Sequence, residues 1–282
     1  MSYRLGIDLG GTKIESVIID EQFQVVKRER IPTNRDEGYE AIIERIIALS
    51  KSMISDYKNF EGPIGICTPG TIEAETGLLK NSNTVCLIGK PIQKDMESEL
   101  GIPVLMENDA NCFALAEATL GAAKKYNVVF GVILGTGCGG GITMLKNIHR
   151  GSNRIAGEWG HTPLPWIEEH DLPRRHCWCG LFDCLETYIS GSAVSLEYER
   201  LTGTHLPVQH IAEISTTDAA AQQVLLNLEN RLARAFAMII NFIDPDAIVI
   251  GGGLSYLSRL YSAIPLQCCK YVFSYTVKTV LL

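Results

Sequence analysis

The feature that most constrains the fold is a pattern that occurs twice, about half a chain length apart. Residues 5–13 and residues 132–140 each read as a buried strand, a glycine-rich turn and the start of a second strand. Such a repeat indicates two related lobes that face each other across a cleft. The length of 282 residues suits two lobes that each bury a core of their own.

Apolar periodicity along the chain indicates an α/β protein. The first half predicts strands at 4–9, 14–20, 23–31, 63–67 and 103–107 and helices at 37–55, 91–100 and 110–120. The second half predicts strands at 128–134, 142–145 and 247–250 and helices at 185–201 and 218–243. The lobe boundary falls near 118–127, so we assign 1–118 to an N-terminal lobe and 119–282 to a C-terminal lobe.

The first glycine turn, which runs from Asp8 through Gly10, Gly11 and Thr12 to Lys13, is a candidate phosphate-binding turn. Glycine lets backbone N–H groups approach an anion with no Cβ in the way. Thr12 and Lys13 can also donate hydrogen bonds to phosphate, and Asp8 can hold a hydrated Mg²⁺. A tight hairpin that binds no ligand is the alternative for this motif alone.

The second glycine turn spans 135–141, with Gly135, Thr136, Gly137 and Gly139 as candidate phosphate contacts. Its glycine spacing formally matches a dinucleotide fingerprint, but a strand follows it instead of the helix that this motif requires. The sequence also contains no P-loop motif. Two strand–glycine–strand turns can instead clamp the phosphates of one nucleotide from both sides.

A third glycine run, Gly251-Gly252-Gly253, follows a buried strand and precedes a helix-like segment. Three residues without side chains would let adenine or ribose lie against the backbone. A plain strand-to-helix turn explains the same run equally well.

Asp109 stands where a predicted strand ends and a predicted helix begins. A helix N-terminus favours the ionised carboxylate, which can take a proton from an attacking hydroxyl group. The alternative is that Asn108 or Asp109 serves only as a helix N-cap. The phosphate turns elsewhere in the chain favour the catalytic interpretation.

Cys177, Cys179 and Cys184 follow a C-x-C-x₄-C pattern in an irregular segment. Three thiolates in one short loop are typical of a structural zinc site, which needs a fourth ligand. The sequence offers His161 first and His176 as a rival. Glu158 and Glu186 flank this segment and can accept hydrogen bonds from sugar hydroxyls, although most glutamates are surface residues.

Composition excludes several other classes of protein. The net charge of −7, with no cluster of Lys and Arg, argues against a nucleic-acid partner. The sequence contains neither an export signal nor an apolar run of about 18 residues, so we expect no membrane partner. Nine cysteines, an odd number, fit free thiols in a reducing compartment. We therefore expect a cytoplasmic protein.

Together these motifs resemble the ROK family (repressors, open reading frames and sugar kinases) of the actin-like ATPase superfamily. The similarity runs from about residue 4 to about residue 262 and rests on six motifs: Asp8–Lys13, Asn108–Asn111, Gly135–Gly141, Glu158–His161, Cys177–Glu186 and Asp244–Gly253. The resemblance implies a two-lobed actin-like (ribonuclease H-like) fold with a central nucleotide and sugar cleft. It also implies an enzyme that transfers a phosphoryl group from MgATP to a free hexose, with O6 as the expected acceptor.

The resemblance further implies individual roles. Asp109 is then the general base, and the sugar is held by Asn83, Asn108, Glu158, His161 and Glu186. Structural Zn²⁺ is bound by His161, Cys177, Cys179 and Cys184. Within the family, residues 79–83 and 157–166 look most like bacterial fructokinase (mannokinase), so we expect fructose or mannose as substrate, with N-acetylglucosamine kinase as the alternative.

Two departures from the family pattern stand out. Asp183 occupies a position before the third cysteine where the family usually has glycine. The family also continues beyond the position of Leu282 into a final helix, so we expect the C-terminal lobe to lack that helix. Dimers are common among relatives, which makes a homodimer an expectation.

Two other functions are weighed against the kinase. A sugar-sensing ROK repressor needs a helix-turn-helix domain, and this sequence opens directly on its first strand. A sugar-binding protein without activity would be expected to lack Asp109 or the Asp8 turn, and both are present.

Overall fold

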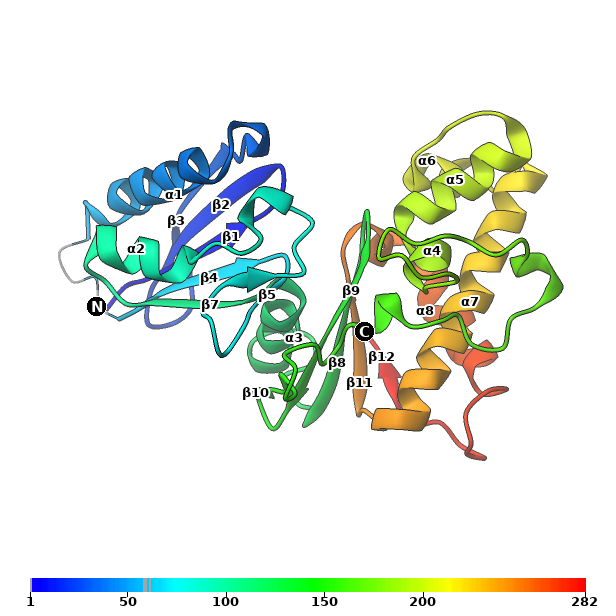
Figure 1. Cartoon of the computed structure of the whole chain (residues 1–282). Helices are drawn as coiled ribbons and strands as arrows, with labels where there is room; N and C mark the ends of the chain where they lie inside the picture. The colour runs from blue at the N-terminus through cyan, green and yellow to red at the C-terminus, as the bar shows by residue number, and fades with distance from the viewer. Residues whose placement is uncertain (1, 58–59, 61) are drawn as a thin grey trace. The chain divides into compact units, whose positions relative to one another are not determined.

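The computed structural model describes residues 2–57, 60 and 62–282, which divide into two compact units. Unit 1 comprises Met1–Cys112 with Ser152–Ile155, and unit 2 comprises Phe113–Gly151 with Ala156–Leu282 (Figure 1). The division falls inside helix α3 (Asp109–Thr119), which also contains the boundary expected at residue 118. The assignment of separate functions to the two lobes stays a prediction.

Unit 1 is built on a mixed five-stranded sheet of order β3-β2-β1-β4-β7. Its strands are β1 (Arg4–Leu9), β2 (Lys13–Ile19), β3 (Val25–Pro32), β4 (Ile64–Thr68) and β7 (Val104–Asn108). The pairs β1–β2 and β2–β3 are antiparallel, whereas β1–β4 and β4–β7 are parallel. The predicted opening meander is therefore confirmed.

Two helices cover the core of unit 1. They are α1 (Tyr39–Ile54) and α2 (Ile92–Leu100), and Ile42, Ile46 and Met53 on one stripe of α1 are fully buried. The buried residues of β1 and β2 alternate with exposed or partly buried ones and meet this stripe in one apolar cluster. Short elements complete the unit: β5 (Thr71–Ile72), β6 (Leu79–Lys80), and the 3₁₀ turns η1 (Arg35–Glu37) and η2 (Val85–Leu87).

Unit 2 repeats the sheet of unit 1. Its strands lie in the order β10-β9-β8-β11-β12, with the same succession of two antiparallel and two parallel pairs. They are β8 (Val128–Leu134), β9 (Cys138–Met144), β10 (Asn147–Ile148), β11 (Ala247–Gly251) and β12 (Val280–Leu281). The repeat predicted from the two glycine turns is confirmed at the level of the whole sheet.

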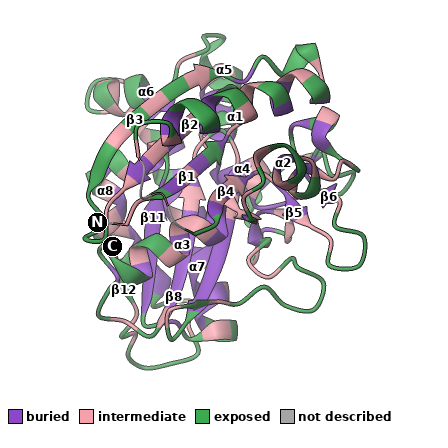
Figure 2. Ribbon diagram, turned by 90° about the vertical axis from the view of Figure 1, so that its left-hand side faces the viewer, coloured by how far each residue is buried: buried purple, intermediate pink, exposed green. Residues whose placement is uncertain are grey.

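Helix α7 (Ala219–Ile243) forms the centre of unit 2 and is largely buried (Figure 2). Asp218 caps it by accepting a hydrogen bond from the backbone N–H of Ala221 at 2.8 Å. The other helical elements are α4 (Glu186–Ile189), α5 (Gly191–Thr202), α6 (Val208–Ile214), α8 (Ser258–Cys268) and the 3₁₀ turns η3 (Trp159–His161), η4 (Glu169–Asp171) and η5 (Gly253–Tyr256).

Two of the predicted elements differ from the structure. The predicted helix at 185–201 is interrupted at Ser190, whose extended backbone and side-chain hydroxyl begin a new helix by accepting from Ala193 N–H at 3.1 Å. Strand β9 begins at Cys138 instead of residue 142, because the glycine-rich segment pairs with β8 along its whole length. The second glycine turn is therefore shorter than the sequence indicated.

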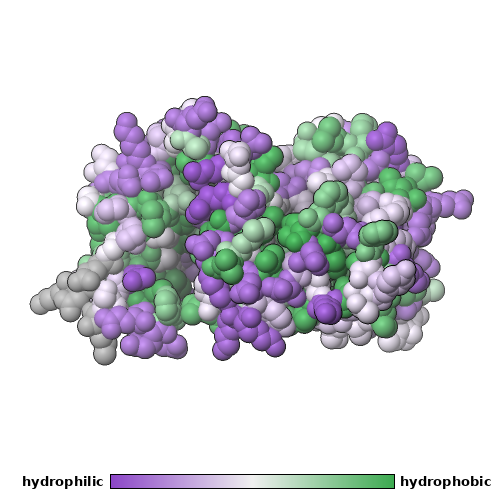
Figure 3. Space-filling model, turned by 90° about the horizontal axis from the view of Figure 1, so that it is seen from below, coloured by the Kyte–Doolittle hydropathy of each residue, from purple (hydrophilic) through white to green (hydrophobic). Residues whose placement is uncertain are grey.

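Among the described residues, no helix combines the length and apolar character needed to cross a bilayer. On the face shown in Figure 3, hydrophobic residues are interspersed with hydrophilic ones.

Candidate functional site

The first glycine turn joins β1 to β2 in unit 1. The N–H of Gly10 donates to the carbonyl of Lys13 at 3.0 Å, and the hydroxyl of Thr33 donates to the carbonyl of Gly10 at 2.6 Å. A Cβ atom on Gly10 would lie 2.9 Å from the Lys13 carbonyl oxygen, so the tight turn requires glycine there.

Asn83 lies beside this turn. A Cβ atom on Gly11 would meet the Thr84 hydroxyl at 3.3 Å and Oδ1 of Asn83 at 3.8 Å. The candidate sugar residue Asn83 and the candidate phosphate turn are thus neighbours within unit 1. The sequence offered no signal for Thr84, which touches the turn more closely than Asn83 does.

Asp8, on β1, lies next to a thiol. Cys67 of β4 donates a hydrogen bond from Sγ to Oδ1 of Asp8 at 3.4 Å. Burial raises the pKa of Asp8, the negative charge of Glu15 acts in the same direction, and the Cys67 hydrogen bond and Lys13 oppose the rise. A cation near this carboxylate would favour its ionised form.

Asn108 and Asp109 lie where β7 runs directly into α3. Oδ1 of Asn108 accepts from the backbone N–H groups of Ala110 at 3.0 Å and Asn111 at 3.2 Å, and its amide donates to the carbonyl of Gly70 at 3.1 Å. Asn108 therefore caps α3, as the alternative interpretation held. Asp109 is the first residue of the helix, where the helix dipole favours a carboxylate.

The second glycine turn, in unit 2, has a backbone hydrogen bond from Gly135 N–H to the Gly137 carbonyl at 3.0 Å and a contact with a side chain. Oε2 of Glu186 accepts from the backbone N–H of Cys138 at 2.9 Å, and a Cβ atom on Gly137 would lie 2.7 Å from that oxygen. The backbone N–H of Gly191 donates to the carbonyl of Gly135 at 2.7 Å. The candidate sugar residue Glu186 is thus in contact with the candidate phosphate turn.

Glu158 belongs to the same surroundings. Burial raises its pKa, His161 opposes that rise, and the negative charge of Glu186 adds to it. Glu158 therefore lies within electrostatic range of His161 and Glu186 in unit 2, as expected for residues that were predicted to flank one site.

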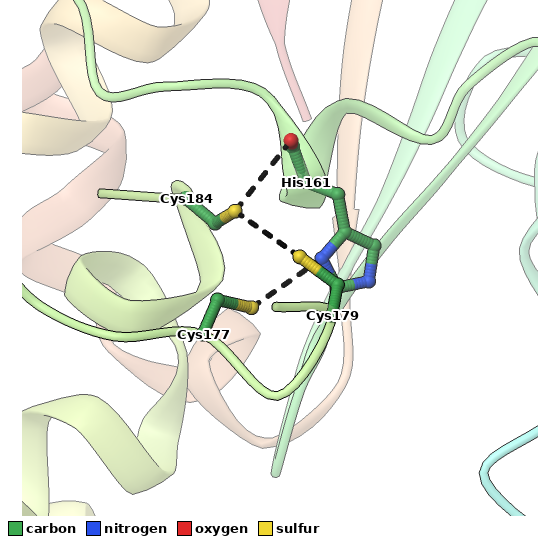
Figure 4. Close-up of side chains that lie close together, drawn as sticks. All are labelled: His161, Cys177, Cys179 and Cys184. Carbon is green, nitrogen blue, oxygen red and sulfur yellow. Dashed lines mark hydrogen bonds between the residues drawn. The ribbon is translucent and has the colours of Figure 1, made fainter. Parts of the chain in front are cut away.

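Four potential metal ligands form one group in unit 2 (Figure 4). The ligand atoms of His161, Cys177, Cys179 and Cys184 all lie within 4.8 Å of one another. Sγ of Cys177 is 3.6 Å from Nδ1 of His161, and Sγ of Cys179 is 3.6 Å from Sγ of Cys184. A tetrahedral zinc ion with Zn–S of about 2.3 Å and Zn–N of about 2.0 Å separates its ligands by roughly 3.5–3.8 Å.

The rival histidine lies elsewhere. His176 packs edge-on against Phe182 at 5.1 Å between ring centres and is not a member of the group found among the described residues. Of the two histidines that the sequence offered, His161 is therefore the one that fits a tetrahedral set.

The thiols of this group differ in acidity. Burial raises the pKa of Cys184 to about 12 and also raises the pKa of Cys177. Burial opposes ionisation of Cys179 as well, but the backbone N–H of Leu181 and the neighbouring thiols lower its pKa. Binding of a metal ion would release protons from these thiols.

The third glycine run has a structural explanation in unit 2. A Cβ atom on Gly251 would lie 2.6 Å from the ring of Phe113, and Gly252 has a φ of 80° and approaches the carbonyl of Leu134. Leu134 ends β8, so the third run lies beside the beginning of the second glycine turn. This arrangement serves the packing of the two strands and leaves a contact with adenosine as a prediction.

Comparison with known proteins identifies the class of protein that this fold and these motifs define. The sequence matches the ROK family over residues 4–281, and the chain belongs to that family. It is 36% identical over 274 residues to the N-acetyl-D-glucosamine kinase of Vibrio atlanticus, covering 95% of this chain and 90% of that protein. It is 37% identical over 265 residues to the same kinase of Pectobacterium atrosepticum, covering 92% of this chain and 86% of that protein.

A solved structure supports the fold. The ROK hexokinase of Thermus thermophilus superposes with a TM-score of 0.85 at 27% identity, covering 99% of this chain and 92% of that chain. The prediction of a ROK-family fold of the sugar-kinase type is confirmed. The closer resemblance to fructokinase finds no support, because the curated relatives described above are N-acetyl-D-glucosamine kinases.

Proposed function

We propose that this chain is an ATP-dependent N-acetylglucosamine kinase. The single observation that carries this proposal is the similarity to N-acetyl-D-glucosamine kinases over 95% of the chain. It replaces the expectation of fructose or mannose, which rested on residues 79–83 and 157–166 alone. The alternative substrate stated from the sequence thereby becomes the preferred one.

The chemical step is in-line transfer of the γ-phosphoryl group to a sugar hydroxyl, which we assign to O6. Asp109 accepts the proton of that hydroxyl as its oxygen attacks phosphorus, and the bond to the β-phosphate oxygen breaks to release ADP. The position of Asp109 at the start of α3 supports this role, because the helix N-terminus keeps a carboxylate ionised.

The sugar ligands in this proposal are Asn83 and Asn108 of unit 1 and Glu158, His161 and Glu186 of unit 2. The side-chain oxygen of Asn108 already accepts hydrogen bonds from the first turn of α3. Asn108 is therefore assigned to donate an amide hydrogen to the sugar, and not to accept a hydrogen bond from it. His161 turns Nδ1 toward Cys177, which assigns its Nε2 to a sugar hydroxyl.

The nucleotide is assigned to the three glycine runs. Their backbone N–H groups, with Thr12, Lys13 and Thr136, bind the phosphates of ATP, and Gly251–Gly253 lie against adenosine. Mg²⁺ would supply charge neutralisation on these phosphates, and Asp8 is the residue of this chain assigned to hold the hydrated ion.

Structural Zn²⁺ is assigned to His161, Cys177, Cys179 and Cys184. The number, type and spacing of these ligands suit a closed tetrahedral site, so the ion holds the loop together and takes no part in phosphoryl transfer. A cytoplasmic location and a homodimer remain predictions, as does the absence of a nucleic-acid partner.

The test is steady-state phosphorylation by the purified chain with MgATP and each of five sugars: N-acetylglucosamine, N-acetylmannosamine, glucose, mannose and fructose. We expect ADP release to be fastest with N-acetylglucosamine at low sugar concentration. Sugar binding without turnover of any member of the panel would favour the sugar-sensing or sugar-binding alternatives instead.

A further inference from the structure

We infer that Trp178 is a positioning residue that orients the Glu186 carboxylate for the sugar. The inference rests on the proposed function, in which Glu186 is a sugar ligand. It assigns a role to a residue that the sequence patterns did not single out, since Trp178 is simply the residue between the first two cysteines of the loop.

The geometry that supports this role is a short hydrogen bond between the two side chains. Nε1 of Trp178 donates to Oε1 of Glu186 at 2.6 Å. The other oxygen, Oε2, accepts from the backbone N–H of Cys138 at 2.9 Å. The carboxylate is therefore held from two sides, by the cysteine loop through one oxygen and by the second glycine turn through the other.

The cysteine loop is built to hold the indole in place. Its turn is closed by hydrogen bonds from Cys177 N–H to the Leu181 carbonyl at 2.8 Å and from Gly180 N–H to the Cys177 carbonyl at 3.0 Å. The indole also packs edge-on against His161, with 4.9 Å between ring centres. The turn that presents the thiols thus also directs the indole N–H at Glu186.

The chemistry of a carboxylate explains why two donors help sugar binding. An ionised carboxylate has about four acceptor positions, and the two observed hydrogen bonds use one on each oxygen. The remaining positions can accept from two sugar hydroxyls, and the carboxylate is already held in one orientation when the sugar arrives. Without the indole, Glu186 would keep only its contact with Cys138 N–H and would lose orientation.

Burial and charge are consistent with a role in positioning. Trp178 is 66% exposed, which is unusual for the largest apolar side chain unless a specific contact holds it. Glu186 has Glu158 within electrostatic range, so a neutral donor that fixes the carboxylate also offsets repulsion between the two acids.

The test is the substitution Trp178→Phe, which removes the N–H and keeps an aromatic ring against His161. We expect the KM for N-acetylglucosamine to rise about five- to tenfold, as loss of a hydrogen bond to a charged group at a partly exposed position predicts. We expect kcat to stay within about twofold and the zinc content to stay unchanged, because the ligands are untouched.

The matched control is Trp166→Phe. Trp166 is 48% exposed in the same unit, but its ring packs against Tyr271, which is not part of the cysteine loop. Its substitution should leave the KM for the sugar unchanged. A purely structural effect of removing an exposed indole would appear in both variants.

A double-mutant cycle identifies the route of the effect. In the Glu186→Ala background, Trp178→Phe should change the KM for the sugar by less than twofold, since alanine offers the indole N–H no side-chain acceptor. An unchanged KM for Trp178→Phe in an active enzyme, or a full effect that persists in the Glu186→Ala background, would overturn this inference alone. A wild-type chain that neither binds nor phosphorylates N-acetylglucosamine overturns the proposed function and this inference with it.

Discussion

The two glycine turns belong to sheets of the same strand order, yet they are held in place differently. The first turn is closed by its own backbone, from Gly10 N–H to the Lys13 carbonyl, and by Thr33. The second also has a backbone bond of its own, from Gly135 N–H to the Gly137 carbonyl, and in addition Glu186, from a helix that follows the cysteine loop, accepts from Cys138 N–H. The turn of unit 1 is thus held by a residue that directly follows β3, whereas the turn of unit 2 is held from the segment that contains the candidate sugar and metal ligands.

The two units also differ in where their ion pairs lie. In each ion pair described in unit 1, such as Lys27–Asp56, the side chain of at least one partner is exposed to water. In unit 2, Arg231 and Arg234 of α7 both reach Asp171 at 2.8 Å, and all three side chains are almost completely buried. Arg234 also donates to the carbonyl of Trp166 at 2.6 Å. These charges fasten the irregular segment before the cysteine loop to the central helix.

The largest expected effect tests the chemistry assigned to unit 1. Replacing Asp109 with Asn keeps the shape of the side chain but removes the proton acceptor, so kcat should fall about 10²–10⁴-fold. The KM for the sugar should change little. Steady-state kinetics measures both, with Glu99→Gln on the exposed side of α2 as a control carboxylate in the same unit. Near-normal kcat in Asp109→Asn would remove Asp109 as the base.

The next largest effect is expected from removing a potential metal ligand in the cysteine loop of unit 2. Wild-type protein prepared without chelators should contain about one zinc per chain, and Cys179→Ser should contain almost none, because a tetrahedral site loses one of its four ligands. Sugar phosphorylation should fall together with the metal. Elemental analysis and kinetics measure the two quantities, and Cys269→Ser, an exposed cysteine outside the group, is the control. Full activity in metal-free Cys179→Ser would make the loop dispensable for the reaction.

A smaller effect sharpens the contrast between the two interiors. Burial alone would raise the pKa of Asp171, but hydrogen bonds from Arg234, the Glu168 backbone and Arg231 lower it to about 2. A carboxyl whose pKa is lower in the folded chain stabilises the fold above its unfolded pKa of about 3.8, and this stability is lost as pH falls toward 2. The interval corresponds to about 2 kcal/mol of unfolding free energy.

Urea denaturation at a series of pH values between 5 and 2 measures this contribution. Asp171→Asn should be less stable at pH 5 and should lose this part of the pH dependence. Asp56→Asn, in an exposed ion pair of unit 1, should behave like the wild type. Equal pH profiles for wild type and Asp171→Asn would contradict the role given to the buried charges.

Local sequence signals predicted much of the fold and of the candidate site. Strands such as β1 and helices such as α1 follow apolar periodicity, and the close spacing of Cys177, Cys179 and Cys184 indicated one loop. Helix α6 and strand β12 were not predicted, because both are short and owe their existence to packing against neighbouring elements.

Contacts between distant residues could not be predicted. Asp171 and Arg231 lie 60 residues apart, and neither has a neighbour in sequence that indicates the pairing. The bond from Trp178 to Glu186 was missed because its sequence signal is a single aromatic residue between two cysteines. The preference for His161 over His176 came from the resemblance, and local spacing alone left both open; in the folded chain His161 is the histidine grouped with the cysteines.

The most direct test of the central claim is a competition between N-acetylglucosamine and fructose at equal concentration with limiting MgATP. A site that forms hydrogen bonds with the acetamido group leaves polar groups unpaired with a plain hexose, at a cost of about 1–3 kcal/mol per group. N-acetylglucosamine phosphate should therefore form at least about ten times faster, the factor that corresponds to 1.4 kcal/mol. Preferential formation of fructose phosphate would contradict the account.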